Sequence, residues 1–408
     1  MGENLLQLLS PDRVDHDELL WLLHVQFGGA EIDPTDLKAG VAFPNIRNAR
    51  IRVRVKGDRI TEITRGPSFD EADVAALADE VRDKLLDGQT TTIHTRVIFS
   101  GNPVAGFFMA PGETFQLLPA PPQAPRPPRH HVADHPFLIQ YPVVTSTDPF
   151  ITSARSSRAL SDRLCFLNAV LIDHISTIGP RTRQMWVATL DPSADTGVPD
   201  VRWGQEFYLI PDFAPSEAFS SPDAAPIPTH DQNLYYSRRA TNFGDPFDLP
   251  DSFARDVQAF ALLDAEKRRR FLRAGQWLMA AHEIRDRHTA SWYIAQVAAI
   301  ESLAHEDVPF VACPAGGKDL NPGPTARFKD FLERHAPGAG TSTQNNALYA
   351  VRSGLVHGTA LLHHDSPFGF SLLHFATGER EEMDRLSSEV SVAMVNWLRD
   401  QASGNRGS

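Results

Sequence analysis

Residues 292–306 have the sequence WYIAQVAAIESLAHE, and this stretch sets the fold class that we expect for the C-terminal part of the chain. Its apolar residues recur at three- and four-residue steps, the spacing that places them on one face of an α-helix. The same periodicity is found at 271–281, 328–332, 348–355 and 383–397. We therefore expect residues 251–402 to form an all-α bundle of roughly five or six helices.

The chain upstream of residue 251 mixes helix and strand patterns. Residues 16–27 and 70–87 predict helices, and the acidic residues that open the second suit the positive end of a helix dipole. Residues 50–55, RIRVRV, alternate apolar and basic side chains as a half-buried strand does. Further strand patterns occur at 91–99, 104–109, 137–144, 184–190 and 205–210, and a further helix pattern occurs at 157–175. The expected fold class is an α+β N-terminal portion followed by an all-α C-terminal helical bundle.

A proline-rich segment gives the clearest boundary in the sequence. Residues 119–128, PAPPQAPRPP, hold six prolines in ten positions. Proline fixes φ and lacks a backbone donor, so this segment is expected to be extended. We predict an α+β domain at 1–118, a linker at 119–134, a mixed α/β region at 135–250, either continuous with the first domain or separate, and the helical bundle at 251–402.

Composition and charge exclude several classes of protein. The 408 residues are 42% hydrophobic and 22% charged, as in folded globular proteins. Lys+Arg 39 against Asp+Glu 51 gives a net charge of −12, which argues against a protein that coats nucleic acid or anionic membrane. Residues 251–408 hold 17 basic and 19 acidic residues, a net of −2. The helical region is therefore still compatible with one short nucleic acid.

Cysteine usage and the N-terminus indicate a cytoplasmic protein. Only Cys165 and Cys313 occur, so neither a disulfide framework nor a Cys-rich zinc site is expected. The N-terminal segment is acidic where a secretory signal is basic. No stretch reaches the roughly 18 apolar residues that a membrane helix needs, so no membrane partner is expected.

Several histidines favour structural roles over metal binding. His282-Glu283 begins like a zinc-protease motif, but Asp286 stands where the second histidine would fall, so we interpret the pair as helix surface. Two local histidine clusters are more typical of solvated loops than of metal sites. We expect no metal and no other cofactor. Their members are His130, His131 and His135 in the first cluster and His357, His363, His364 and Asp365 in the second. A metal-dependent hydrolase that uses the second cluster remains a third hypothesis.

The segment 347–358, ALYAVRSGLVHG, carries the most informative motif, because Arg352 and His357 are separated by four residues in a helical pattern. It resembles the Arg-x4-6-His motif of HEPN-domain proteins, and its context is similar to the ApeA-like HEPN branch. The resemblance covers about 255–402. Residues 292–306 also resemble the family's earlier core helix with its embedded glutamate, here Glu301.

The resemblance implies a metal-independent endoribonuclease. Such cleavage needs a base for the 2′-OH proton, an acid for the 5′-oxygen and a fixed cation for the charge on the phosphate. Histidine titrates near neutrality and guanidinium binds two phosphate oxygens, so His357 and Arg352 fit these roles. A 2′-OH nucleophile restricts the reaction to RNA.

Helical geometry sets a condition on this site. A five-residue offset is about 500° on an ideal helix, which leaves the two side chains roughly 140° apart. Loosening at Gly354, a helix end at Gly358 or pairing with a second protomer would bring them together. HEPN nucleases typically take the last route, so the resemblance implies a homodimer. A helix end at Gly358 would also favour protonated His357 through the helix dipole.

The same residues are also expected if Arg352 has only a structural role in the bundle. A charged side chain inside a bundle must be paired, so Arg352 would bind a carboxylate such as Glu301. Ser353 stands where many active family members carry Asn, Asp or His, which favours a non-catalytic HEPN module that dimerises or binds a ligand. Tyr349 either faces the same groove as Arg352 or is a buried aromatic.

A basic run precedes these helices, and a solvated helix face is the usual explanation of such a run. RNA-phosphate contacts are expected there if nucleic acid binds. Its members are Lys267, Arg268, Arg269, Arg270 and Arg273. The leading hypothesis is a cytoplasmic, homodimeric HEPN-type endoribonuclease or toxin-like defence effector, whose N-terminal portion senses a trigger or restrains the helical region.

Overall fold

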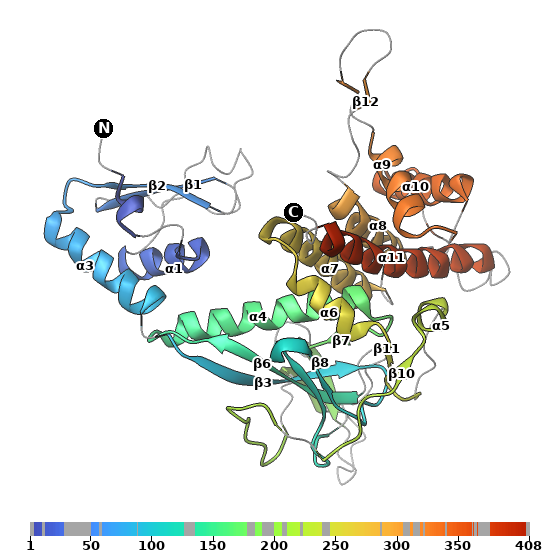
Figure 1. Cartoon of the computed structure of the whole chain (residues 1–408), viewed down its shortest axis with the longest axis horizontal. Helices are drawn as coiled ribbons and strands as arrows, with labels where there is room; N and C mark the ends of the chain where they lie inside the picture. The colour runs from blue at the N-terminus through green and yellow to red at the C-terminus, as the bar shows by residue number, and fades with distance from the viewer. Residues whose placement is uncertain are drawn as a thin grey trace. The chain divides into compact units, whose positions relative to one another are not determined.

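The structure is a computed structural model of the chain, and it falls into two compact units. The first unit comprises residues 1–92 and 142–159, and the second comprises 93–141 and 160–408 (Figure 1). The described residues are 4–9, 13–27, 50–56, 59–87, 89–125, 135–177, 184–189, 200–205, 210–220, 223–238, 245–285, 288–304, 311–312, 319–320, 323–338, 341–360, 362, 365 and 376–404.

The first unit packs four helical segments against a hairpin. Strand β1 buries alternate residues, as its sequence predicts, and pairs antiparallel with β2, which was not expected from the sequence. The carboxylate of Asp70 caps helix α3 by accepting from the backbone N–H of Asp73. The elements are η1 (Leu5–Leu9), α1 (His16–Phe27), β1 (Ile51–Lys56), β2 (Arg59–Arg65), α3 (Glu71–Val81) and η2 (Arg82–Leu86).

A five-stranded sheet has the strand order β4-β5-β6-β3-β7. The expected linker at 119–134 joins β5 and β6, which are neighbours in this sheet, so the division between the two units lies elsewhere than the sequence indicated. Strand β4 is shorter than the 104–109 pattern, and β9 precedes the 205–210 pattern. The bounds are β3 (Thr91–Ser100), β4 (Phe108–Met109), β5 (Gln116–Pro119), β6 (His135–Val144) and β7 (Ile175–Ser176), with a separate hairpin of β8 (Gln184–Thr189) and β9 (Asp200–Gln205).

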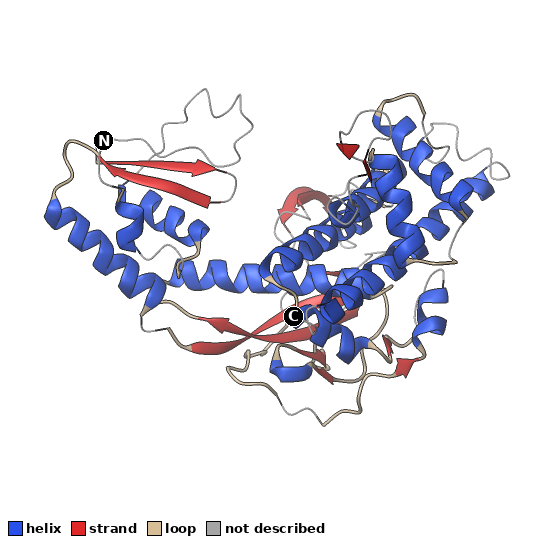
Figure 2. Ribbon diagram, turned by 45° about the horizontal axis from the view of Figure 1, so that its top comes forward, coloured by secondary structure: helices blue, strands red, loops and turns tan. Residues whose placement is uncertain are grey.

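Helix α4 (Pro149–Val170) begins in the first unit and ends in the second. In its second half the guanidinium carbon of Arg163 lies 4.9 Å from the centroid of the Tyr141 ring, and Arg163 Nη2 donates to the carbonyl of Thr114 at 2.9 Å. This part of the helix runs along the sheet in both ribbon views (Figures 1 and 2). Gly275 approaches it so closely that a Cβ there would collide with the carbonyl of Cys165.

The described residues from 253 to 404 contain six longer helices, in agreement with the expected helical C-terminal region. Helix α11 packs against α6 and α9, and α8 packs against α7, α9, α10 and α11. The rings of Phe271 and Trp397, both fully buried, stack with centroids 6.1 Å apart. The bounds are α6 (Phe253–Ala261), α7 (Ala265–Ile284), α8 (Thr289–Ala304), α9 (Pro324–His335), α10 (Ser342–Val356) and α11 (Ala376–Gly404).

The remaining elements are short. They are η3 (Pro111–Glu113), β10 (Thr229–His230), α5 (Gln232–Ser237), β11 (Leu249–Pro250), β12 (Val311–Ala312) and β13 (Asp319–Leu320). Between residues 211 and 250, the described elements are the short β10, α5 and β11. Within the described part of the chain, no helix combines the length and the apolar character that crossing a bilayer requires.

Candidate functional site

Helix α10 positions the candidate site. Thr341 caps it in a reciprocal capping box with Gln344, which satisfies its first backbone donors. Its apolar side packs Leu348 into the core, and the Tyr349 ring lies 5.3 Å from that of Phe328 on α9. Tyr349 is 7% exposed, so it is a buried aromatic, and it also lies on the side of α10 that carries Arg352, so it combines the two sequence alternatives.

The end of α10 presents His357. This residue is the C-cap, and Gly358 follows with φ of +67°, a left-handed conformation that glycine adopts without strain. The backbone N–H of Gly358 donates to Leu355 at 3.2 Å, and that of Thr359 to Gly354 at 2.9 Å, the pattern of a Schellman motif. The helix therefore ends at Gly358, which was one of the three routes that the sequence left open, and His357 is exposed at its negative end.

Arg352 lies on a different side of α10, over Glu301 of α8. Its Nη2 donates to Glu301 Oε2 at 2.9 Å, and the Tyr349 hydroxyl donates to Glu301 Oε1, also at 2.9 Å. The Arg352 guanidinium carbon is 5.5 Å from the Tyr349 ring centroid. Tyr349 and Arg352 are three residues apart and so share a helix face. The expected pair of Arg352 and Glu301 is confirmed.

This cluster is only partly closed to water. The side chains of Arg352 and Glu301 are 23% and 27% exposed. Burial raises the pKa of Tyr349, and its hydrogen bond to the Glu301 carboxylate raises the pKa further, so the phenol stays protonated as the donor. The Nε atom of Arg352 is buried and has no hydrogen-bond partner among the described residues. The guanidinium thus keeps donor capacity that Glu301 does not use.

The structure does not bring Arg352 and His357 together within one chain. Helix α10 continues without a break through Gly354, whose missing Cβ leaves room for the Ala360 side chain, so this glycine does not loosen the helix. Ser353 lies between them, and its carbonyl accepts the His357 N–H at 3.0 Å. No contact between Arg352 and His357 is found among the described residues, as the offset on an ideal helix predicts.

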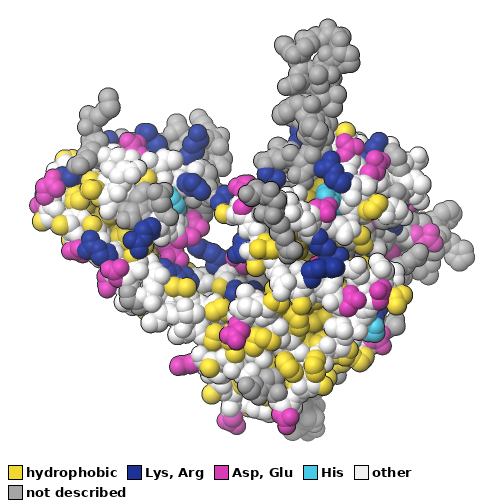
Figure 3. Space-filling view, in the orientation of Figure 1, with side chains coloured by type: hydrophobic (Ala, Val, Ile, Leu, Met, Phe, Trp, Pro, Cys, Tyr) yellow, Lys and Arg dark blue, Asp and Glu magenta, His cyan; other side chains and the backbone are white. Residues whose placement is uncertain are grey.

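The basic run of α7 is interleaved with acidic partners. Lys267 Nζ lies 3.5 Å from Asp264, and Arg269 and Arg270 each lie 3.6 Å from Glu266. Arg268 instead covers the ring of Phe260, with 4.8 Å between guanidinium carbon and ring centroid. Basic and acidic side chains are mixed on the face of the second unit drawn in Figure 3. This local pairing matches the solvated-face explanation for most of the run.

Arg273 is exposed and, unlike Arg269 and Arg268, makes neither an ion pair nor an aromatic-ring contact with the part of the chain that the structure describes. It is therefore the member of the run with the most accessible positive charge.

The metal-site alternatives receive no support from the described residues, among which no group of three or more metal-ligating side chains converges. Asp365 caps α8 instead, accepting from the backbone N–H groups of Thr289 at 2.9 Å and Ala290 at 2.7 Å. His130, His131, His363 and His364 lie outside the described residues.

The surface interpretation of the His282-Glu283 pair holds for Glu283, which is exposed, but His282 is only partly exposed and its ring stacks on that of His174 with centroids 4.7 Å apart. Burial lowers the pKa of His282 to about 4, and the charge of Arg285 contributes to the shift. Burial also lowers the pKa of His174, whose Nδ1 lies 2.8 Å from Asn168 Oδ1. The sequence carries no sign of this contact, because the two residues come from α7 and from the loop after α4.

Sequence reasoning also missed a second arginine cluster, in which Arg399 of α11 binds Asp256 of α6.

Comparison of the chain with models of known protein families, with curated proteins and with solved structures finds no match.

Proposed function

We propose that the C-terminal helices form a HEPN-like module that cleaves RNA as a homodimer, without a metal, through Arg352 and His357. The observation that carries the proposal is the state of Arg352. One hydrogen bond to Glu301 and the Tyr349 ring hold the guanidinium in place, while its Nε has no partner among the described residues. A fixed, partly exposed cation with unused donors is suited to a phosphate whose charge grows in the transition state.

The exposed histidine supplies the proton chemistry of the proposal. His357 would accept the 2′-OH proton, the 2′-oxygen would attack phosphorus, and the P–O5′ bond would break to leave a 2′,3′-cyclic phosphate. The histidine of a second protomer, protonated, would give its proton to the departing 5′-oxygen. Since Arg352 and His357 do not meet within one chain, the proposal requires that two chains combine their pairs in one cleft.

A substrate and a biological role follow as parts of the same proposal. Arg273 would hold a neighbouring phosphate, and the rest of the basic run would add weaker, screened attraction. The protein would act as a toxin-like defence effector whose N-terminal portion senses a trigger or restrains the helical region. Expression in a host cell would then be toxic, and His357→Ala would relieve the toxicity.

The test is cleavage of labelled RNA by the purified full-length protein in the presence of EDTA. We expect His357→Ala and Arg352→Ala each to lower kcat/KM by at least about 100-fold. His288→Ala is the matched control, because His288 is also exposed and lies in the same helical region, and it should retain full activity. A DNA strand of the same sequence should remain intact.

A non-catalytic module that dimerises or binds a ligand is the second candidate. It is favoured by the ion pair itself, because Glu301 neutralises Arg352 in the absence of substrate. A wild-type protein that sediments as a dimer but cleaves no RNA would support this candidate. Equal cleavage by wild type and His357→Ala would contradict the nuclease.

A further inference from the structure

One side of helix α7 is open to solvent, and it carries a tryptophan. The buried side of the helix consists of Phe271, Ala274, Gly275, Leu278 and Ala281. Trp277 lies outside this set and is 43% exposed. In the described part of the chain, the ring pairs of α7 involve Phe271 and His282 but not Trp277. The indole of Trp277 is therefore available to a partner from outside the chain.

Two arginines lie on the same face as Trp277. Arg273 is one turn before Trp277, and Arg269 is one turn before Arg273. Residues four apart on an α-helix are neighbours on one face, about 6 Å apart along its axis. Arg273 is exposed, and the side chain of Arg269 is 44% exposed although it lies 3.6 Å from Glu266. These three residues, Arg269, Arg273 and Trp277, form the α7 row, which presents two cations and one aromatic ring to solvent.

The charge of α7 is opposite to that of the whole chain. The helix holds five basic and two acidic residues, a net of +3, whereas the chain carries a net of −12. The two carboxylates belong to Glu266 in the first turn and Glu283 in the last turn, so residues 267–282 hold none. The phosphates of a nucleic acid complement this distribution of charge.

The surroundings of Trp277 favour a nucleic acid over a protein partner. The hot spots of protein interfaces are also rich in tryptophan and arginine, but they lie in a well-packed centre that is largely apolar. The neighbours of Trp277 on the open side of α7 are instead Arg273, Gln276 and Ala280. Proteins that bind single-stranded nucleic acid combine basic side chains along the phosphate backbone with aromatic rings on which bases stack. The α7 row has this combination.

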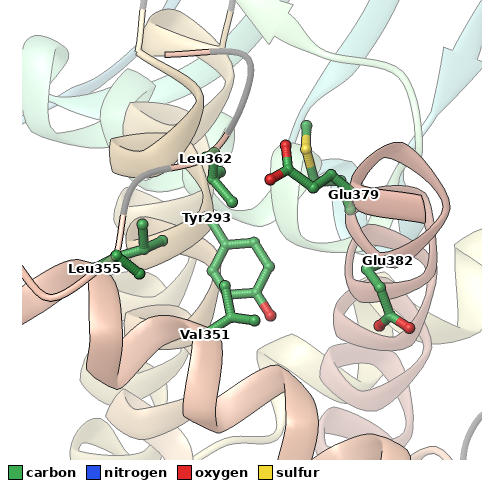
Figure 4. A pocket seen from close by; sticks show the side chains of 8 residues that line it. Tyr293, Val351, Leu355, Leu362, Glu379 and Glu382 are labelled. Carbon is green, nitrogen blue, oxygen red and sulfur yellow. The ribbon is translucent and has the colours of Figure 1, made fainter. Parts of the chain in front are cut away.

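A cavity of about 360 Å³ beside α10 is less suited to the strand. Val351 and Leu355 form one side of it, and the Tyr293 ring lies between them and α11 (Figure 4). The Tyr293 hydroxyl already donates to the Leu348 carbonyl at 2.9 Å. No lysine or arginine is found among the described residues that line this cavity, so these residues provide no cation for a phosphate.

We infer that α7 binds the RNA as a single strand, with one base stacked on Trp277 and neighbouring phosphates at Arg273 and Arg269. This binding mode rests on RNA as the proposed substrate and specifies that the bound part is unpaired. A base within a duplex has both faces covered by its neighbours, so only an unpaired base can stack on the indole. The axial step between the two arginines is similar to the distance between neighbouring phosphates of an extended strand.

The test measures binding separately from cleavage. The probe is a fluorescein-labelled single strand of oligo(dA), about 12 nucleotides long. It has no 2′-OH, so the proposed cleavage cannot destroy it, whereas stacking and phosphate contacts do not need that group. Fluorescence anisotropy with the full-length protein should show saturable binding that weakens with salt, and a blunt duplex of the same length should bind more weakly. No binding of the single strand, or tighter binding of the duplex, would overturn the inference.

Trp277→Ala should weaken binding of the single strand about tenfold, because stacking of one base is lost, and should leave the slope of log Kd against log salt unchanged. Trp277→Phe keeps an aromatic ring and should restore most of the affinity. Trp21→Ala is the matched control, because Trp21 is also 43% exposed but belongs to the first unit, and it should bind as wild type does. Equal binding by wild type and Trp277→Ala would contradict the stacking role.

Arg273→Ala should reduce the slope of log Kd against log salt by about 0.7, the contribution of one phosphate contact on a single strand. Arg52→Ala, which removes an exposed arginine of β1 in the first unit, should leave the slope unchanged. Thermal unfolding verifies that each variant folds. An unchanged slope for folded Arg273→Ala would refute the phosphate contact.

Binding and cleavage can fail separately. A protein that binds the single strand through Trp277 but cleaves no RNA would support α7 as the binding face and contradict the nuclease. RNA cleavage by Trp277→Ala and Arg273→Ala with the kcat/KM of wild type would contradict α7 as the binding face and leave Arg352 and His357 as the proposed catalytic pair.

Discussion

Two arginine clusters in the C-terminal helices differ in how completely they are satisfied. Arg399 donates two hydrogen bonds to Asp256, from Nε to Oδ1 at 2.6 Å and from Nη2 to Oδ2 at 2.8 Å. It also donates hydrogen bonds to Ser252 and Gln232. The Asp256 side chain is 0% exposed. Arg352 has one bond to a carboxylate that is 27% exposed.

This difference distinguishes a structural arginine, whose donors are bonded within the fold, from an arginine that can still bind a ligand. Each polar atom of the Arg399 cluster that is buried has a partner, as packing in a core requires. Arg352 has a single carboxylate partner and a side chain that is 23% exposed, so part of its guanidinium is open to a ligand even though its Nε is buried. Substitution of each cluster should therefore change the free energy of unfolding by different amounts.

The largest loss of stability is expected for Asp256→Ala. It leaves the Arg399 guanidinium without its buried counter-charge, so the free energy of unfolding should fall by about 3–5 kcal/mol in urea titrations. Glu266→Ala, which removes an exposed carboxylate 3.6 Å from Arg270, should change it by less than about 1 kcal/mol. Similar losses for the two variants would contradict the structural role of the Arg399 cluster.

An intermediate effect is expected from acid on the stacked His174 and His282 rings. The pKa of His282 is about 4 in the fold, below its ordinary 6.5, so the unfolded chain binds more protons between these values. Stability should be complete above about pH 6.5 and fall by about 3 kcal/mol as the pH drops to 4. His282→Gln should flatten this profile relative to wild type, and His288→Gln should leave it unchanged. A wild-type profile that is already flat in this window would rule out the buried neutral pair.

The smallest loss is expected for Arg352→Ala. Its ion pair with Glu301 is single and partly exposed, so the free energy of unfolding should fall by about 1 kcal/mol or less. Arg273→Ala, an exposed arginine of α7, is the control and should have no measurable effect. A loss as large as that of Asp256→Ala would mean that Arg352 is structural, and this would remove the main support for the nuclease.

Local periodicity predicted the helices well and the sheet less well. The apolar spacing of α7, α8 and α11 is a property of each segment, so the sequence alone was sufficient to locate them. Strand β2, RITEITR, buries Ile60 and Ile63 three residues apart because the pairing with β1 is irregular after Arg54, and this breaks the period of two. The proline-rich segment resembles an interdomain linker, because sequence cannot show that the strands on either side pair.

The candidate site was predictable in its chemistry but not in its contacts. The rule that a bundle arginine needs a carboxylate predicted the bond between Arg352 and Glu301, and Gly358 predicted the end of α10. The Tyr349 bond to the same carboxylate, the role of Asp365 as the cap of α8 and the stacking of His174 on His282 were not predicted. Each of these depends on which segments meet in three dimensions.

Gly275 has a consequence for how the second unit can move. Because even a methyl group at this position would strike the Cys165 carbonyl, α7 and the second half of α4 touch backbone to backbone at one point. Sliding α7 by about one turn would bring a residue of the same helix face, such as Phe271 or Met279, to that point, and neither fits. The contact at Gly275 therefore prevents α7 from sliding along this part of α4. A rearrangement of the C-terminal helices would carry this part of α4 with it by pivoting, since translation along the helix axis is blocked.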